Sequence, residues 1–318
     1  MPDLLVLGGS GFVGRALCAE LMQRNGAAGG RLTVPTRHLQ RARAIQLLPT
    51  VELVQADLQD DRQLAQLVAG RDAVVNLVGI LHGREVDFQR VHVDLPNRVA
   101  NACRHAGVRR LVHVSALGAQ AGAPSMYLRS KAAAEAVLLQ SGLDVTVLRP
   151  SVMFGEEDRF MNLFAQLQRL LPVVPLGGAD ARFQPVWVQD VAAAIAQTLA
   201  RGAVAARCYD CAGPKVYTLE QLVRLAGRWS GHPRPVWALP DGLARLQAGL
   251  MEWLPGEPLM SRDNLDSMKV PNVANDALPG LDALGVRRSA LEAVAPDYLG
   301  WKAGPARLEA WRRQAGRH

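Results

Sequence analysis

Four glycines close behind the first apolar run of the chain constrain the fold more than any other feature. The run Leu4–Leu7 is typical of a buried parallel strand, and residues 12 to about 25 have the pattern of a helix. Free backbone N–H groups and the helix dipole make a strand, a glycine turn and a helix N-terminus a site for anions. The spacing therefore predicts a dinucleotide diphosphate site, with a merely tight strand–helix turn as the alternative. We expect the cofactor to contact Gly8, Gly9, Ser10, Gly11, Phe12, Val13 and Gly14.

Short apolar strands and helical stretches alternate along the first half of the chain. Strands are predicted at Leu32–Thr36, Val51–Gln55, Ala73–Val78, Leu111–Val114 and Val145–Leu148. Helices are predicted at Gln63–Val68, Phe88–His105, Leu128–Gln140, Val191–Ala200, Leu219–Trp229 and Gly242–Trp253. The alternation is typical of an α/β fold with a Rossmann-type doubly wound parallel sheet. We expect residues 1–150 to form this NADP(H)-binding domain. Residues 151–318 are expected to form a smaller C-terminal α/β lobe, some segments of which return to the Rossmann core.

The composition excludes several classes of protein. Hydrophobic residues make up 49% and charged residues 20% of the chain, which indicates a globular protein rather than a disordered one. No apolar run reaches the roughly 18 residues of a membrane span, and the early first strand predicts that there is no secretory leader. The net charge of +7 comes mainly from scattered arginines, so no nucleic-acid partner is expected.

Cysteines are sparse, which is typical of a reducing, cytoplasmic compartment. Cys208 and Cys211 have C-x-x-C spacing, but no second pair completes a metal site. We therefore expect structural thiols and no bound metal.

The residues after the second, third and fourth predicted strands bear on the choice of nucleotide. Arg37 ends the second strand where NAD sites place an acid, and a guanidinium pairs well with a 2′-phosphate. NADP(H) is therefore favoured over NAD(H), with a solvated Arg37 as the alternative. Asp57 is placed either to accept a bond from the adenine amino group or to cap the following helix. Val78 and Gly79 would let the cofactor pass close to the backbone.

Tyr127 and Lys131 lie four residues apart on a predicted helix and therefore share one face. A free tyrosine has a pKa near 10, and a nearby ammonium group is expected to lower that pKa. The pair can then transfer a proton to or from a substrate oxygen, while Lys131 also holds the nicotinamide ribose. Ser115, at the end of the fifth strand, is expected to bond the reacting oxygen. The alternative is that Tyr127 and Lys131 contact only the cofactor.

These motifs together resemble the extended and atypical branches of the short-chain dehydrogenase/reductase superfamily. The stretches Tyr127–Ala132, Arg159–Phe164 and Ala181–Val186 are similar to one subgroup, the Rossmann-fold accessory subunit of respiratory complex I (NADH:ubiquinone oxidoreductase) and its bacterial stand-alone relatives. The resemblance implies NADP(H) binding, with a nucleotide that is structural in the mitochondrial complex. It adds Leu58 and Pro150 to the expected cofactor contacts.

Two positions depart from the superfamily pattern. Ser115 precedes Tyr127 by only 12 positions, closer than in extended enzymes. His92 stands where the superfamily usually has an asparagine, either as a packed side chain or as a catalytic one.

Two functions follow from these features. The first is an NADP-dependent oxidoreductase or epimerase-like enzyme acting on a carbonyl or hydroxyl group of an unidentified, hydrophobic small molecule. The second is a non-catalytic nucleotide-binding protein of a respiratory or quinone-related membrane assembly. For the second, we expect peripheral contact at the inner face of the membrane, with the tail residues Arg307, Arg312, Arg313 and Arg317 as candidates.

Overall fold

A computed structural model describes residues 2–26, 30–200, 207–253, 256 and 258–300 of the chain. The four tail arginines lie outside these residues. The chain divides into two compact units, each assembled from three separate segments. The first unit comprises Met1–Pro150, Val188–Cys211 and Ala274–Arg287; the second comprises Ser151–Trp187, Ala212–Val273 and Arg288–His318.

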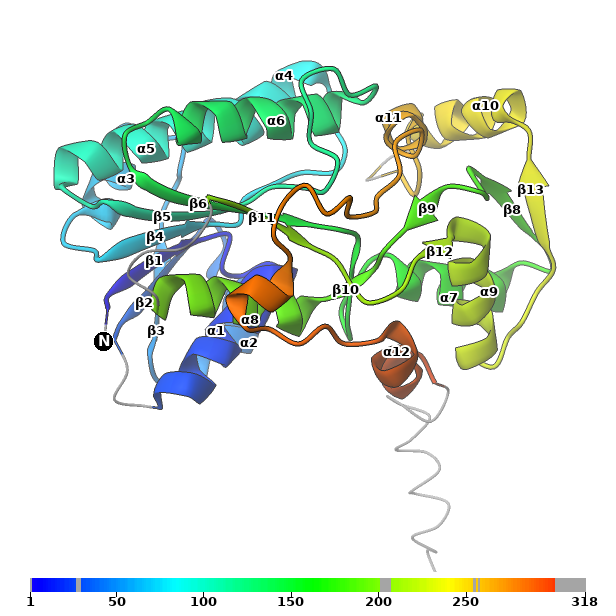
Figure 1. Cartoon of the computed structure of the whole chain (residues 1–318), viewed down its shortest axis with the longest axis horizontal. Coiled ribbons are helices and arrows are strands. Elements are labelled where there is room, and N and C mark those ends of the chain that lie inside the picture. The colour runs from blue at the N-terminus through cyan, green and yellow to red at the C-terminus, as the bar shows by residue number, and fades with distance from the viewer. Residues whose placement is uncertain (1, 27–29, 201–206, 254–255, 257, 301–318) are drawn as a thin grey trace, which may run out of the picture. The chain divides into compact units, whose positions relative to one another are not determined.

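A seven-stranded parallel sheet forms the centre of the first unit (Figure 1). Its strands are β1 (Leu4–Leu7), β2 (Leu32–Thr36), β3 (Val51–Gln55), β4 (Ala73–Asn76), β5 (Arg110–Val114), β6 (Asp144–Pro150) and β11 (Cys208–Cys211). Their order is β11-β6-β5-β4-β1-β2-β3, so the winding reverses at β1. In such sheets ligands bind beyond the carboxyl ends of the strands at this reversal. The predicted fold class, a Rossmann-type doubly wound sheet, is confirmed.

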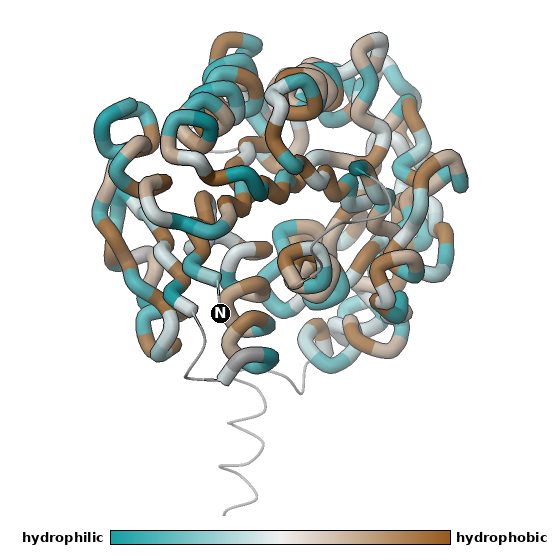
Figure 2. The backbone as a smooth tube through the Cα atoms, turned by 60° about the vertical axis from the view of Figure 1, so that its left-hand side comes forward, coloured by the Kyte–Doolittle hydropathy of each residue, from teal (hydrophilic) through white to brown (hydrophobic). Residues whose placement is uncertain are grey.

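Helices cover both faces of this sheet (Figure 1). One face carries α1 (Phe12–Asn25), α2 (Arg43–Gln46) and α8 (Val188–Ala200), and the other carries α3 (Asp61–Val68), α5 (Leu95–Ala106) and α6 (Met126–Leu139). The described part of the unit also contains the 3-10 helices Leu39–Ala42 and Leu281–Leu284 and the short α4 (Glu85–Phe88). Figure 2 shows the strands as mainly hydrophobic and the covering helices as alternately hydrophobic and hydrophilic, the pattern of one buried helix face.

The predicted helix Phe88–His105 contains a turn that is not α-helical. Residues Gln89–Asp94 form a π-helical turn, in which the N–H of Leu95 donates to the carbonyl of Arg90 five residues earlier. Pro96 explains the wide turn, since proline has no N–H for the carbonyl of His92 and its ring would clash with that carbonyl in an α-helix. The predicted helical stretch is therefore present, but its sequence pattern did not indicate the π turn, which leaves His92 buried.

Within its described residues, the second unit contains five helices and three small sheets. The helices are α7 (Met161–Leu170), α9 (Leu219–Trp229), α10 (Asp241–Glu252), α11 (Arg262–Ser267) and α12 (Leu291–Leu299). The strands pair as β7 (Met153–Phe154) with β10 (Val186–Trp187), β8 (Val174–Gly177) with β13 (Val236–Leu239), and β9 (Arg182–Phe183) with β12 (Tyr217–Thr218). None of the described helices combines the length and the apolar character needed to cross a bilayer.

Candidate functional site

The glycine turn after β1 is packed so tightly that side chains are excluded. Gly8 has a positive φ of 79°, and a Cβ atom there would lie 3.1 Å from the backbone carbon of Leu77. A Cβ on Gly9 would lie 2.8 Å from the side chain of Val34. A Cβ on Gly14 would lie only 2.3 Å from the Cα of Gly9, so α1 rests directly on the backbone of the turn. These close contacts therefore require glycine at all three positions.

The N-terminus of α1 has no side-chain cap within the described part of the chain. Gly11 occupies the N-cap position with extended backbone angles, and no acidic residue lies in the first turn. The first N–H groups of a helix have no partner within the helix. Ser10, Phe12 and Val13 belong to this turn and helix start, so backbone N–H groups and the helix dipole meet there. This arrangement fits a diphosphate.

Arg37 follows β2 directly and is exposed. Among the described residues, no acidic side chain forms an ion pair with Arg37. The side chain is therefore open to an anionic ligand or to solvent.

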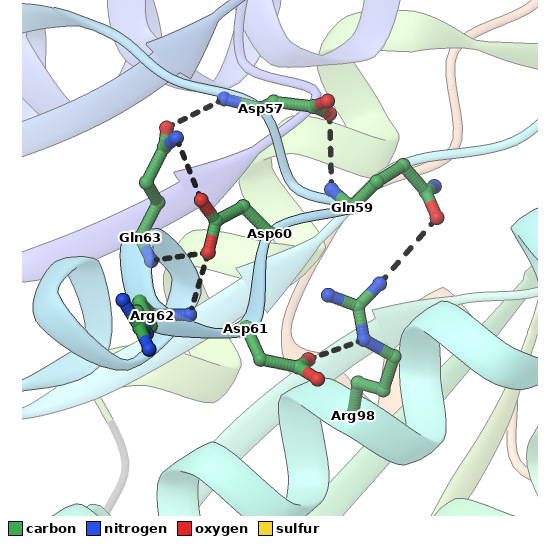
Figure 3. Close-up of polar contacts among 7 residues, drawn as sticks. All are labelled: Asp57, Gln59, Asp60, Asp61, Arg62, Gln63 and Arg98. Carbon is green, nitrogen blue, oxygen red and sulfur yellow. Dashed lines mark hydrogen bonds and ion pairs between the residues drawn. The ribbon is translucent and has the colours of Figure 1, made fainter.

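Asp57 does not cap α3, so that alternative is wrong. Its backbone N–H donates to Gln63 Oε1 at 2.9 Å, and its Oδ1 accepts the N–H of Gln59 at 3.0 Å (Figure 3). The cap is Asp60, whose Oδ1 accepts the N–H groups of Arg62 at 2.8 Å and Gln63 at 3.3 Å. Asp60 precedes the first helical residue, as capping requires, whereas Asp57 lies in the preceding exposed turn.

The turn after β4 approaches α6. Asn76 Oδ1 accepts the N–H of Val78 at 3.1 Å, which ends the strand two residues earlier than predicted. A Cβ on Gly79 would lie 3.2 Å from Lys131 Nζ and 3.4 Å from His92 Nε2. Three residues distant in sequence, Gly79, His92 and Lys131, thus meet at the carboxyl end of the sheet.

Helix α6 presents Tyr127 and Lys131 on one face. Lys131 is 5% exposed, its Nζ donates to the carbonyl of Val114 at 3.2 Å, and Nζ lies 6.0 Å from the centre of the Tyr127 ring. Burial lowers the pKa of Lys131 to about 8, against the opposing effect of Glu135.

Burial also governs Tyr127, whose ring lies edge-on to those of Phe88 and His92. It raises the pKa of Tyr127 to about 12. The expected lowering by Lys131 was wrong for this arrangement, because loss of solvation outweighs the distant ammonium charge.

Ser115 lies directly beyond β5 and is 3% exposed. Its N–H donates to the carbonyl of Leu148 at 2.8 Å, but its Oγ has no hydrogen-bond partner among the described residues. Burying a hydroxyl without a hydrogen-bond partner costs free energy, so this atom is a candidate for contact with a ligand.

Two further predicted cofactor contacts, Leu58 and Pro150, also lie in the first unit. Leu58 packs against its hydrophobic core, and the carbonyl of Pro150 accepts the N–H of Leu117 at 2.9 Å.

Two polar residues near the carboxyl ends of β4 and β5 were not identified from the sequence. The Nδ2 of Asn76 lies 3.3 Å from Nδ1 of His113, which is 1% exposed. Burial, followed by the charge of Lys131, lowers the pKa of His113 to about 3. The available signal was a polar residue in a strand that is otherwise mainly apolar, at the last position of β4 for Asn76 and the penultimate position of β5 for His113.

A cavity of about 160 Å³ in the first unit is lined by residues of α4, the π turn Gln89–Asp94 and α6. Its lining residues are Glu85, Phe88, Gln89, Val93, Met126, Arg129, Ser130 and Ala133. None of the glycine-turn residues belongs to this lining, so the cavity is separate from the predicted diphosphate site.

Known proteins resemble this chain in sequence and in fold. A family model described as NAD(P)H-binding matches residues 8–201. NADH dehydrogenase (ubiquinone) 1 alpha subcomplex subunit 9, mitochondrial, of Rattus norvegicus is 32% identical over 301 residues, covering 92% of this chain and 78% of the relative. The protein of the same name from Arabidopsis thaliana is 30% identical, covering 85% and 70%.

A solved NADPH-dependent quinone oxidoreductase from Escherichia coli superposes with a TM-score of 0.72 at 20% identity, covering 92% of this chain and 98% of the other. At this identity the likeness shows the fold alone. The resemblance predicted from the sequence is confirmed by the relatives and the family model together. The chain belongs to the NAD(P)H-binding, atypical short-chain dehydrogenase/reductase family that includes alpha subcomplex subunit 9 of NADH dehydrogenase (ubiquinone).

Proposed function

We propose that the first unit binds NADP(H), with the diphosphate at the start of α1 and the 2′-phosphate at Arg37. The main support for this proposal is the N-terminus of α1, which has no side-chain cap in the described chain and packs through Gly14 directly against the backbone of Gly9. The exposed Arg37, in a position without an acidic partner among the described residues, supports the phosphate-bearing nucleotide. Asp57 and Gly79 are proposed to contact the adenine end and the nicotinamide end, respectively.

Calorimetric titration with NADPH and NADH tests the nucleotide. We expect NADPH to bind at least tenfold more tightly, since a charged hydrogen bond contributes about 1.5–3 kcal/mol. Arg37→Ala is expected to remove this preference, whereas Arg43→Ala, at another exposed arginine, keeps it. Equal effects of the two substitutions, or no heat with either nucleotide in the wild type, would contradict the proposal.

We further propose reduction of a carbonyl group as the reaction. NADPH supplies the hydride when bound. A phenol with a pKa of about 12 is protonated at neutral pH, so Tyr127 serves as a proton donor to the developing alkoxide rather than as a base. Ser115 Oγ, which has no partner among the described residues, is suited to bond the carbonyl oxygen. Lys131 holds the ribose and Tyr127 in place. The substrate is proposed to be a hydrophobic small molecule.

The relatives favour a second function, retention of the nucleotide as a structural element of a membrane-associated assembly. Two of them carry the name of a subunit of NADH dehydrogenase (ubiquinone). In this role Tyr127 and Lys131 contact the cofactor without turnover, and the chain associates peripherally with a respiratory or quinone-related complex.

Tyr127→Phe separates the two functions. For an enzyme, wild type oxidises NADPH with a quinone or carbonyl substrate, and Tyr127→Phe loses at least a hundredfold in rate while its affinity for NADPH is retained. For a structural role, mass spectrometry finds nucleotide that copurifies with both proteins, and its oxidation state is unchanged by the substrate panel.

A further inference from the structure

His92 links two parts of the first unit that are distant in sequence. Its Nε2 accepts the backbone N–H of Ile80 at 3.0 Å. Its Nδ1 lies 2.8 Å from Ser130 Oγ, and that hydroxyl donates to the carbonyl of Tyr127 at 2.8 Å. A continuous chain of hydrogen bonds thus runs from the turn after β4 to helix α6.

The partners determine where the imidazole proton lies. A backbone N–H can only donate, so Nε2 is unprotonated and Nδ1 carries the hydrogen. Ser130 donates its own hydrogen to Tyr127 and therefore accepts from Nδ1. Both ring nitrogens are occupied, and His92 is 1% exposed. Burial and the charges of Lys131 and His113 hold its pKa at about 2, so the ring is neutral and does not act as an acid or a base.

The hydrogen bonds of His92 lie next to Gly79, where the turn after β4 passes close to Lys131. The backbone there is so close that an added Cβ would lie 3.2 Å from Lys131 Nζ. The bond from Ile80 to His92 fixes the residue directly after Gly79, and the bond to Ser130 fixes the helix that carries Lys131. The ring of His92 also lies 5.7 Å from that of Tyr127. A small movement of the turn would therefore change the space beside the side chains of Lys131 and Tyr127.

The local sequence accounts for the helical turn that positions His92. Pro96 cannot donate to the carbonyl of His92, and the π turn Gln89–Asp94 replaces a regular helical turn. Phe88 packs against His92 at 5.5 Å between ring centres.

We propose that His92 is a positioning residue that locks the Val78–Ile80 turn onto α6, and thereby sets the spacing between Gly79 and Lys131 for the nucleotide. This inference rests on the proposed nucleotide binding and deepens it. It assigns to His92 a role that is neither catalytic nor simple packing.

Two substitutions at this position test the proposal. His92→Gln keeps one acceptor and one donor in the same side chain, whereas His92→Phe keeps a ring and removes both. We expect the Ile80 amide to exchange at least tenfold faster with solvent in His92→Phe and at the wild-type rate in His92→Gln, measured without nucleotide. We expect the Kd for NADPH to rise at least tenfold in His92→Phe and to stay within threefold of wild type in His92→Gln.

Controls separate positioning from general stability. Val99→Ala lowers stability in the α5 core of the same unit without touching the turn, so its Kd for NADPH should be unchanged. Ser130→Ala removes only the α6 end of the link and serves if His92→Phe does not fold; its Kd is expected to rise severalfold. Wild-type exchange and affinity in His92→Phe, or failure of folded His92→Gln to restore them, would overturn the proposal. If wild type binds no nucleotide, the proposed function fails, and the exchange of Ile80 alone then supports or overturns the lock.

Discussion

Gly14→Ala should displace α1 from the glycine turn. The new Cβ would lie 2.3 Å from the Gly9 Cα and 2.5 Å from its carbonyl carbon and oxygen. These are backbone atoms, so no rotamer change relieves the overlap. Reaching an ordinary contact of 3.4 Å requires a shift of about 1.1 Å in helix or turn. Overpacking costs about 1–3 kcal/mol, and alanine regains about 1 kcal/mol in helix propensity. The expected net loss of up to about 2 kcal/mol corresponds to a fall of about 4 °C in melting temperature.

The effect on binding should be larger than the effect on stability. The same 1.1 Å shift moves the N–H groups proposed to hold the diphosphate, and we expect the Kd for NADPH to rise at least tenfold in calorimetric titration. Gly242→Ala is the matched control, because its Cβ would meet nothing within 4 Å in α10. It should leave both melting temperature and Kd unchanged or slightly improved. Wild-type affinity in Gly14→Ala would refute the reasoning, because the turn would then tolerate a displaced helix.

Two further predictions concern charged groups of the first unit. Asp60→Ala should lower the melting temperature by about 2 °C, whereas Asp57→Ala should not, since only Asp60 caps α3. The pKa of Asp60 is lowered on folding, so this difference is present above pH 3.8 and fades as the pH falls below it; equal effects of the two substitutions would contradict the assignment of the cap. Lys131→Met should raise the melting temperature at pH 7, because a pKa lowered from 10.5 to about 8 means that folding opposes the charged lysine by up to about 3 kcal/mol. Between pH 8 and 10.5 the unfolded chain binds more protons than the folded one, so the wild type gains stability as the pH rises and the advantage of Lys131→Met becomes smaller. Scanning calorimetry at pH 7 and pH 10 measures this difference. A variant that is less stable than the wild type at pH 7 would contradict the prediction.

Most strands of the first unit were predictable because they are short runs rich in apolar residues. The bounds of β1, β2 and β3 match the prediction, while β4 ends early because Asn76 turns the chain through its bond to Val78. Helix α7 was not predicted, although Asp158 marks its start by accepting the N–H groups of Met161 and Asn162. That signal is short and lies in an irregular stretch that contains three acidic residues, Glu156, Glu157 and Asp158.

The residue types of the candidate site were readable from the sequence, but their electrostatics were not. Spacing alone places Tyr127 and Lys131 on one helix face. The pKa of Tyr127 depends on Phe88 and His92, which reach it only through a helix interrupted by a π turn. Periodicity carries no information about such a turn, so the direction of the pKa shift followed from the fold and not from the motif.

The carboxyl end of the sheet carries polar groups that a purely structural core would not need. His113 Nε2 and Ser115 Oγ are buried without a hydrogen-bond partner among the described residues, and Lys131 is held where its charge is disfavoured. Each such group costs free energy that an apolar residue of similar size would save. These three groups all lie at the carboxyl end of the sheet, where Lys131 Nζ also donates to the carbonyl of Val114. A ligand that accepts hydrogen bonds from Ser115 and Tyr127 would recover part of this free energy on binding, and a carbonyl oxygen has that chemistry.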